Sequence, residues 1–181
     1  MTDKLVEEKA QNKSRNKKTS FSVLLSSIPK IRSWKENVIR KGSTDHDKIS
    51  SFFIAFYDTN DQYHRESAQL VKKLHSYAPE IVTSDYIFDE TATYLLLTHG
   101  FYGFLRAKKF DKDVLDSKKF NFVFINDFIF QNARKMFKKY NKDKKWSFTN
   151  CTSFALMEDY NFSEVLTFDR NFAQKGFKSL P

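Results

Sequence analysis

The chain has 181 residues, 40% of them hydrophobic and 20 of them phenylalanine, which is enough apolar material for one domain with a packed core. Four glycines and three prolines argue against a turn-rich β-sandwich or barrel, and a lone cysteine, Cys151, excludes an internal disulfide and favours a reducing, cytoplasmic setting. No apolar run approaches the roughly 18 residues of a transmembrane helix. Residues 1–25 are unlike a secretory signal, because Asp3, Glu7 and Glu8 lie near the start and the apolar cluster over residues 21–25 is too short.

The net charge of +9 is unevenly distributed along the chain. Residues 1–45 contain 11 Lys and Arg against 5 Asp and Glu, whereas the remainder contains 20 against 17. We predict a basic N-terminal extension over residues 1–45, disordered or partly helical, followed by one domain over residues 46–181. Such an extension can bind RNA, DNA or an acidic membrane surface by counterion release, or it can be a solvated segment without a specific role.

Strands and helices are predicted to alternate along the domain. The run over residues 51–57 is apolar on both faces, which is typical of a central parallel strand. Further strands are predicted over residues 80–83, 120–125, 164–168 and 177–180, and helices over residues 62–75, 85–98, 100–108 and 127–140. Another helix is expected near Thr149 and Asn150, which are good cap residues. This alternation predicts an α/β fold, with helices on both faces of a mainly parallel central sheet.

The sequence contains no convincing pairing of a nucleophile with a base. His64, His75 and His99 fall on predicted helices, where we expect them to be surface residues or to be satisfied by hydrogen bonds. Cys151 falls in the first turn of a predicted helix, which can stabilise a thiolate, but no base lies beside it in the sequence. We therefore expect Cys151 to pack in the core. There is also no glycine-rich phosphate loop and no paired cysteine site.

Two carboxylates stand where predicted strands end or helices begin. Asp169 follows the strand over residues 164–168, and Glu90 lies near the start of the helix after the strand over residues 80–83. Ligands of open α/β sheets bind at the carboxyl ends of the strands, and gathered carboxylates are tolerable when a divalent cation such as Mg²⁺ neutralises them. Bound metal can activate water against a phosphodiester. The alternative role for Asp169 is to cap the helical turn over residues 170–174.

Four sequence blocks carry a family resemblance: FFIAFYDTNDQYHRESA, VTSDYIFDETATYLL, WSFTNCTSFALM and VLTFDRNFAQKGF. With them, residues 49–181 resemble the PIN-domain family, in particular its VapC-like toxin ribonucleases. The resemblance implies a three-layer α/β/α fold and endoribonuclease activity on structured RNA that depends on Mg²⁺ or Mn²⁺. It implies catalytic positions at Glu90, Asn150 and Asp169, with Glu90 and Asp169 as the metal ligands. It further implies a cognate antitoxin and a homodimer.

Two of the four acidic positions of the family are substituted in this chain. Ile49 stands at the first Asp of a D-T-S pattern, and Asn150 stands at the third acidic position. Asp47 could replace the first carboxylate only by a two-residue slip of a buried strand, which would displace its apolar pattern. Asn150 offers an amide oxygen without charge. We therefore expect weaker metal binding than a four-carboxylate site provides.

Three interpretations follow from these departures. The first is a metal-dependent endoribonuclease of weakened activity. The second is a catalytically degenerate PIN domain, a pseudoenzyme, that binds RNA or an antitoxin. The third is a remnant gene with a damaged start of the domain. Basic clusters over residues 108–119 and 134–145 are candidate RNA contacts, although solvated helix faces have the same composition.

Overall fold

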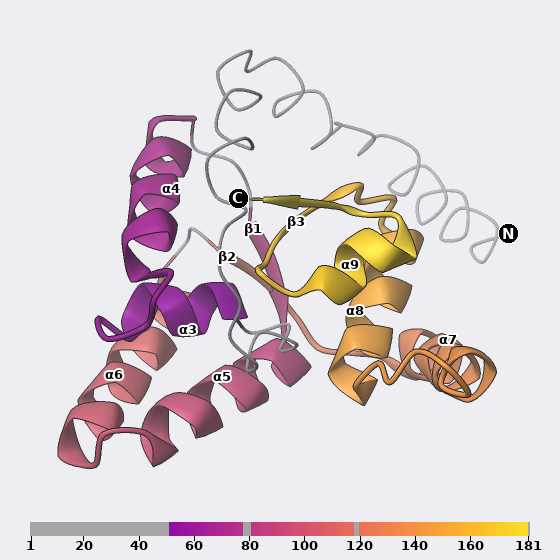
Figure 1. The fold of residues 1–181 in the computed structure, drawn as a ribbon, viewed down its shortest axis with the longest axis horizontal. Coiled ribbons are helices and arrows are strands. Elements are labelled where there is room, and N and C mark those ends of the chain that lie inside the picture. The colour runs from indigo at the N-terminus through magenta and orange to yellow at the C-terminus, as the bar shows by residue number, and fades with distance from the viewer. Residues whose placement is uncertain (1–50, 78–80, 118–119, 181) are drawn as a thin grey trace, which may run out of the picture.

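The computed structural model describes residues 51–77, 81–117 and 120–180 (Figure 1). The predicted extension over residues 1–45 lies outside the described residues, and so do Asp47 and Ile49. The elements in chain order are α3 (Ser51–Tyr57), α4 (His64–Tyr77), β1 (Ile81–Ser84), α5 (Asp85–Leu97), α6 (Phe101–Asp111), the π-helical segment η2 (Lys112–Asp116), β2 (Phe120–Val123), α7 (Asp127–Tyr140), α8 (Phe148–Asp159), β3 (Glu164–Leu166), α9 (Arg170–Lys175) and β4 (Lys178–Leu180).

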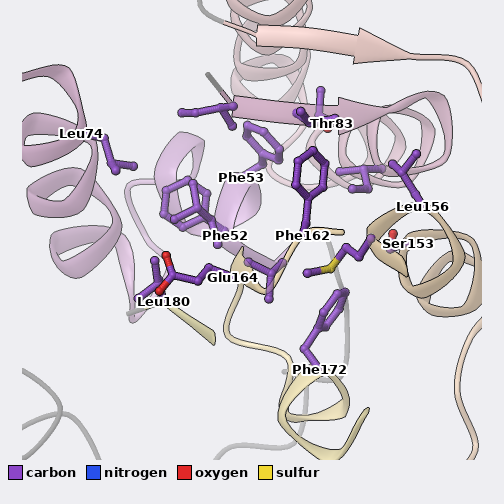
Figure 2. A pocket seen from close by; sticks show the side chains of 16 residues that line it. Phe52, Phe53, Leu74, Thr83, Ser153, Leu156, Phe162, Glu164, Phe172 and Leu180 are labelled. Carbon is purple, nitrogen blue, oxygen red and sulfur yellow. The ribbon is translucent and has the colours of Figure 1, made fainter. Parts of the chain in front are cut away.

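All strand pairs of the described residues are parallel, as predicted. β1 pairs with β2, with Ile81 opposite Phe120, and β3 pairs with β4, with Glu164 opposite Lys178. No hydrogen-bond ladder joins these two pairs within the described part of the chain. An apolar cavity of about 120 Å³ lies between them, lined by residues of β1 and β3 together with α3 and α8 (Figure 2). The fold is therefore α/β with parallel strands, which confirms the predicted class.

Two apolar clusters lie on the two sides of these strands. The first joins side chains of α3, α4, α5 and α6, among them Phe53, Leu95 and Phe110. The second joins side chains of α7, α8 and α9, among them Ile129 and Phe154. Helices thus cover the strands from both sides, because each parallel strand pair must bury both of its faces.

The strand predicted over residues 51–57 is wrong, because this segment is the helix α3. All of its residues except Phe56 are buried. The segment therefore has no polar face, and in this it resembles a central strand. Periodicity cannot separate a fully buried short helix from a buried strand. Tertiary packing decides for the helix, whose Phe53 ring lies 5.3 Å from the ring of Phe110 on α6.

The remaining elements match their predictions, with shifts at the boundaries. The helix predicted near Thr149 and Asn150 is α8, but its N-cap is Ser147, whose hydroxyl accepts a hydrogen bond from the backbone N–H of Asn150 at 3.0 Å. Thr149 and Asn150 therefore lie inside the first turn. His99 was predicted on a helix, but it lies in the turn between α5 and α6 with φ of 60°.

None of the helices in the described ranges combines the length and the apolar character that crossing a membrane requires.

Candidate functional site

Asp169 lies three residues beyond the last residue of β3 and is buried, with 1% of its surface exposed. Its carboxylate Oδ1 accepts a hydrogen bond from the backbone N–H of Asn171 at 2.8 Å, which makes Asp169 the N-cap of α9. Its own backbone N–H donates to the hydroxyl of Thr167 at 3.0 Å. Both interpretations of the sequence therefore apply, since the carboxylate caps a helix and also stands beyond the carboxyl end of a strand.

Asn150 is in direct contact with Asp169. Its side chain is completely buried in the first turn of α8, and its Nδ2 donates to Oδ2 of Asp169 at 2.6 Å. The hydroxyl of Ser147 donates to the amide oxygen of Asn150. The amide group must face the carboxylate with its N–H, because a carboxylate oxygen can only accept. The structure thus brings together two of the three predicted site residues through a short, charge-assisted hydrogen bond.

Glu90, the third predicted site residue, lies in the second turn of α5 and is half-buried. α5 begins directly after β1, and the side chain of Ser84 caps it by accepting from the backbone N–H of Ile87. The ring of Tyr86, in the first turn of α5, lies 5.9 Å from the ring of Phe148 in the first turn of α8. The N-terminal turns of the helices that carry Glu90 and Asn150 are therefore neighbours.

Ser51 and Thr167 belong to the surroundings of Asp169 and were not singled out from the sequence. The two hydroxyls lie 3.3 Å apart, and Ser51 Oγ accepts from the backbone N–H of Phe168 at 2.9 Å. Ser51 thereby ties the start of α3 to the segment that follows β3, 117 residues away. The sequence did offer one indication for Ser51, because the three residues from Ile49 to Ser51 align with D-T-S and Ser51 matches its serine.

The donor set of the described residues does not fit a Mg²⁺ or Mn²⁺ site. No group of three or more His, Cys, Asp and Glu residues within those ranges is arranged to hold a metal ion. Mg²⁺ requires oxygen ligands, whereas the amide of Asn150 directs its N–H at Asp169 and its oxygen at Ser147. With this hydrogen bond in place, the described residues leave too few oxygen ligands for such a cation.

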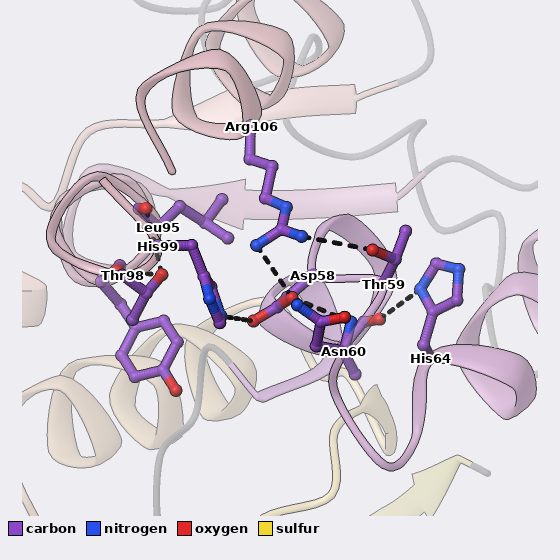
Figure 3. A network of polar contacts seen from close by, with 10 residues as sticks. Asp58, Thr59, Asn60, His64, Leu95, Thr98, His99 and Arg106 are labelled. Atoms are coloured by element: carbon purple, nitrogen blue, oxygen red, sulfur yellow. Dashed lines mark hydrogen bonds and ion pairs between the residues drawn. The ribbon is translucent and has the colours of Figure 1, made fainter. Parts of the chain in front are cut away.

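A second polar network surrounds Asp58, at the end of α3 (Figure 3). Asp58 is 5% exposed, and its two carboxylate oxygens lie 3.0 Å from a guanidinium nitrogen of Arg106 and 3.2 Å from Nε2 of His99. Arg106 also donates to the hydroxyl of Thr59 at 3.2 Å. The network joins the end of α3 to α6 and to the turn before it. His99 is thus hydrogen-bonded, as expected, although it is not helical.

Cys151 is a buried core residue, as predicted, with no exposed surface. Burial raises the pKa of its thiol to about 11. We expect iodoacetamide at pH 8 to modify Cys151 far more slowly in the folded protein than in urea, because both access and thiolate are lacking. Mass spectrometry of the timed reaction measures this ratio. Equal rates in the two states would show that the thiol is accessible and ionised.

Comparison with known proteins assigns the chain to a family. The family model described as PIN domain matches residues 50–178. A VapC ribonuclease of Archaeoglobus fulgidus is 26% identical over 125 residues, which cover 68% of this chain and 76% of the relative. The crystal structure of Mycobacterium tuberculosis VapC20, a sarcin–ricin loop cleaving toxin, superimposes with a TM-score of 0.61 at 23% identity, over 71% of this chain and 92% of that one. The predicted resemblance is confirmed, and the chain belongs to the PIN domain family.

Proposed function

We propose that this protein is a VapC-type endoribonuclease, the toxin of a toxin–antitoxin pair, acting in the reducing cytoplasm. The observation that carries the proposal is the buried carboxylate of Asp169, which lies beyond the carboxyl end of a parallel strand inside the PIN match. Similarity to a VapC ribonuclease supports the same reaction class.

The proposed site residues are Glu90, Asn150 and Asp169. PIN-domain nucleases of the VapC class depend in general on a divalent metal, and Glu90 and Asp169 are the family carboxylates that the described part of this chain retains for Mg²⁺ or Mn²⁺. If a cation were held there, it would supply activation of water and stabilisation of the leaving oxygen of a phosphodiester. The chain's own contribution is positional, because the N–H of Asn171 and the hydroxyl of Thr167 hold Asp169 in place.

RNA is the proposed substrate, and basic side chains near α7 support it. Lys135, Lys139 and Lys175 line a groove of about 480 Å³ between α7 and α8, together with the exposed ring of Phe128 and the acidic side chains of Glu158 and Asp159. Lys175 forms an ion pair with Glu158, so Lys135 and Lys139 are the candidates for phosphate contacts. Lysines contribute phosphate contacts, and aromatic rings can stack on bases. A cognate antitoxin and a homodimer also belong to the proposal. The exposed apolar side chains of α5 and α6 support a protein partner, namely Leu96, Leu97, Phe101, Tyr102, Phe104 and Leu105.

A second candidate function is RNA or antitoxin binding without cleavage. The hydrogen bond from Asn150 to Asp169 favours it, because it engages the carboxylate that a catalytic cation would need. A PIN domain of this kind would retain the lysines of α7 and its partner surfaces while lacking nuclease activity.

The first experiment measures cleavage of total RNA by the purified full-length protein in Mn²⁺. We expect slow cleavage that is lost in EDTA and that falls by about 100-fold or more in Asp169→Ala and in Glu90→Ala, since both remove proposed metal ligands. Asp111→Ala, at an exposed position at the end of α6, is the matched control and should cleave like the parent.

Two other outcomes are informative. Cleavage that persists in both site variants would indicate a contaminating nuclease. A protein that melts cooperatively but leaves RNA intact would overturn the proposed activity and favour the binding-only candidate. The variant carrying both Ile49→Asp and Asn150→Asp should then gain cleavage if the two substituted positions are the cause of the silence.

A further inference from the structure

We propose that the side-chain amide of Asn150 takes the place of a divalent cation at Asp169, so that this centre folds without metal. A single substitution, Asn150→Asp, would then convert it into a centre whose stability depends on the cation.

The geometry of the pair supports this exchange. Asn150 and Asp169 are both buried, and the amide nitrogen lies 2.6 Å from Oδ2 of Asp169. A carboxylate in such a place requires compensation for the water it loses, either from a cation or from hydrogen-bond donors. Here an amide N–H supplies it, at a distance typical of a charge-assisted hydrogen bond.

Neighbouring groups hold the amide in this orientation. The hydroxyl of Ser147 donates to the amide oxygen of Asn150 and accepts from the backbone N–H of the same residue. Oδ1 of Asp169 is engaged by the backbone N–H of Asn171. A cation that approached Oδ2 would have to displace the amide N–H, and rotation of the amide would break its contact with Ser147. The parent chain should therefore bind Mn²⁺ weakly in the absence of RNA.

Substitution of Asn150 by Asp changes the sign of this interaction. The amide donor becomes a second carboxylate facing Asp169 at hydrogen-bond distance, and two such groups repel one another unless a proton or a cation lies between them. The variant thereby offers two adjacent carboxylates to a hard cation that prefers oxygen ligands.

The test is thermal unfolding of full-length variants in EDTA and in millimolar Mn²⁺. In EDTA we expect Asn150→Asp to melt about 5 °C or more below the parent, and Mn²⁺ should restore most of this difference. The parent should shift by less than about 1 °C in Mn²⁺. Asn121→Asp makes the same chemical change at an exposed position of β2 and should behave like the parent.

A reversed pair keeps the test decisive. The double variant Asn150→Asp with Asp169→Asn places one carboxylate and one amide at the same two positions, and asparagine is as good an N-cap as aspartate. We expect it to melt near the parent temperature in EDTA and to respond little to Mn²⁺. Recovery of this kind would show that pairing of amide and carboxylate, rather than either side chain alone, stabilises the centre.

Three results would overturn the proposal. The first is a parent protein that Mn²⁺ stabilises as strongly as it stabilises Asn150→Asp. The second is an Asn150→Asp variant that responds to Mn²⁺ no more than Asn121→Asp does. The third is an Asn150→Asp variant that fails to fold even with Mn²⁺. The melting temperature reports on Asn150 and Asp169 in the absence of RNA. Failure of this proposal is therefore distinguishable from failure of the cleavage experiment.

Discussion

Replacement of Phe154 by alanine is expected to lower the free energy of unfolding by about 4 kcal/mol. Phe154 on α8 is completely buried in the apolar cluster of α7, α8 and α9. Its ring centroid lies 5.0 Å from that of Trp146 and 4.8 Å from that of Phe172, both in edge-to-face geometry. The substitution removes both aromatic contacts and leaves a cavity that rigid neighbours on α8 and α9 cannot fill.

Urea unfolding followed by circular dichroism measures this effect. Phe128→Ala is the matched control, because Phe128 is a helical phenylalanine that is 61% exposed. It should change the free energy of unfolding by less than about 1 kcal/mol. A similar small effect at Phe154 would mean that the second apolar cluster does not carry the stability of the fold. Because α8 also bears Asn150, the same variant should loosen the contact between Asn150 and Asp169.

Asp58→Ala is expected to cost about 3 kcal/mol of unfolding free energy. Its carboxylate is buried, and it is the charge partner of Arg106, whose side chain is only 17% exposed. Removal of the carboxylate leaves the guanidinium poorly hydrated and without its counter-charge, and it also releases His99 in the turn between α5 and α6. An exposed ion pair would contribute far less, because water compensates for its loss.

A double-mutant cycle separates this interaction from other effects of the substitution. Arg106→Met removes the stranded charge while keeping an apolar stem, so the variant with both substitutions should be more stable than Asp58→Ala alone. Asp111→Ala, an exposed aspartate at the end of α6, is the matched control and should be nearly neutral. Additive effects of the two substitutions would show that Asp58 and Arg106 do not interact in solution.

The sequence located both residues that meet at the candidate site, Asn150 and Asp169, by motif and by position beside a predicted strand end. It did not reveal that they bond to each other. Nineteen residues separate them, and only the packing of α8 against α9 and β3 brings the amide to the carboxylate. Ser51 and Thr167 were missed for the same reason, since a hydroxyl becomes part of a site only through its neighbours.

Local pattern was sufficient wherever an element has one apolar and one polar face or a clear cap. α7, with charged side chains on one face and Ile129 and Ala133 on the other, was predicted to its exact ends. Pattern failed at α3, because a short segment that is buried on all sides has the same composition as a helix or as a strand. There the choice depended on the partners supplied by the rest of the fold.

The sequence by itself determined that this is a basic, phenylalanine-rich α/β chain of the PIN domain family, with two of its acidic positions substituted. These properties depend only on residue types, order and spacing. Tertiary structure alone decided what the substitution at Asn150 does. An asparagine can offer either its oxygen or its N–H, and the buried carboxylate of Asp169 on one side and the hydroxyl of Ser147 on the other select the N–H.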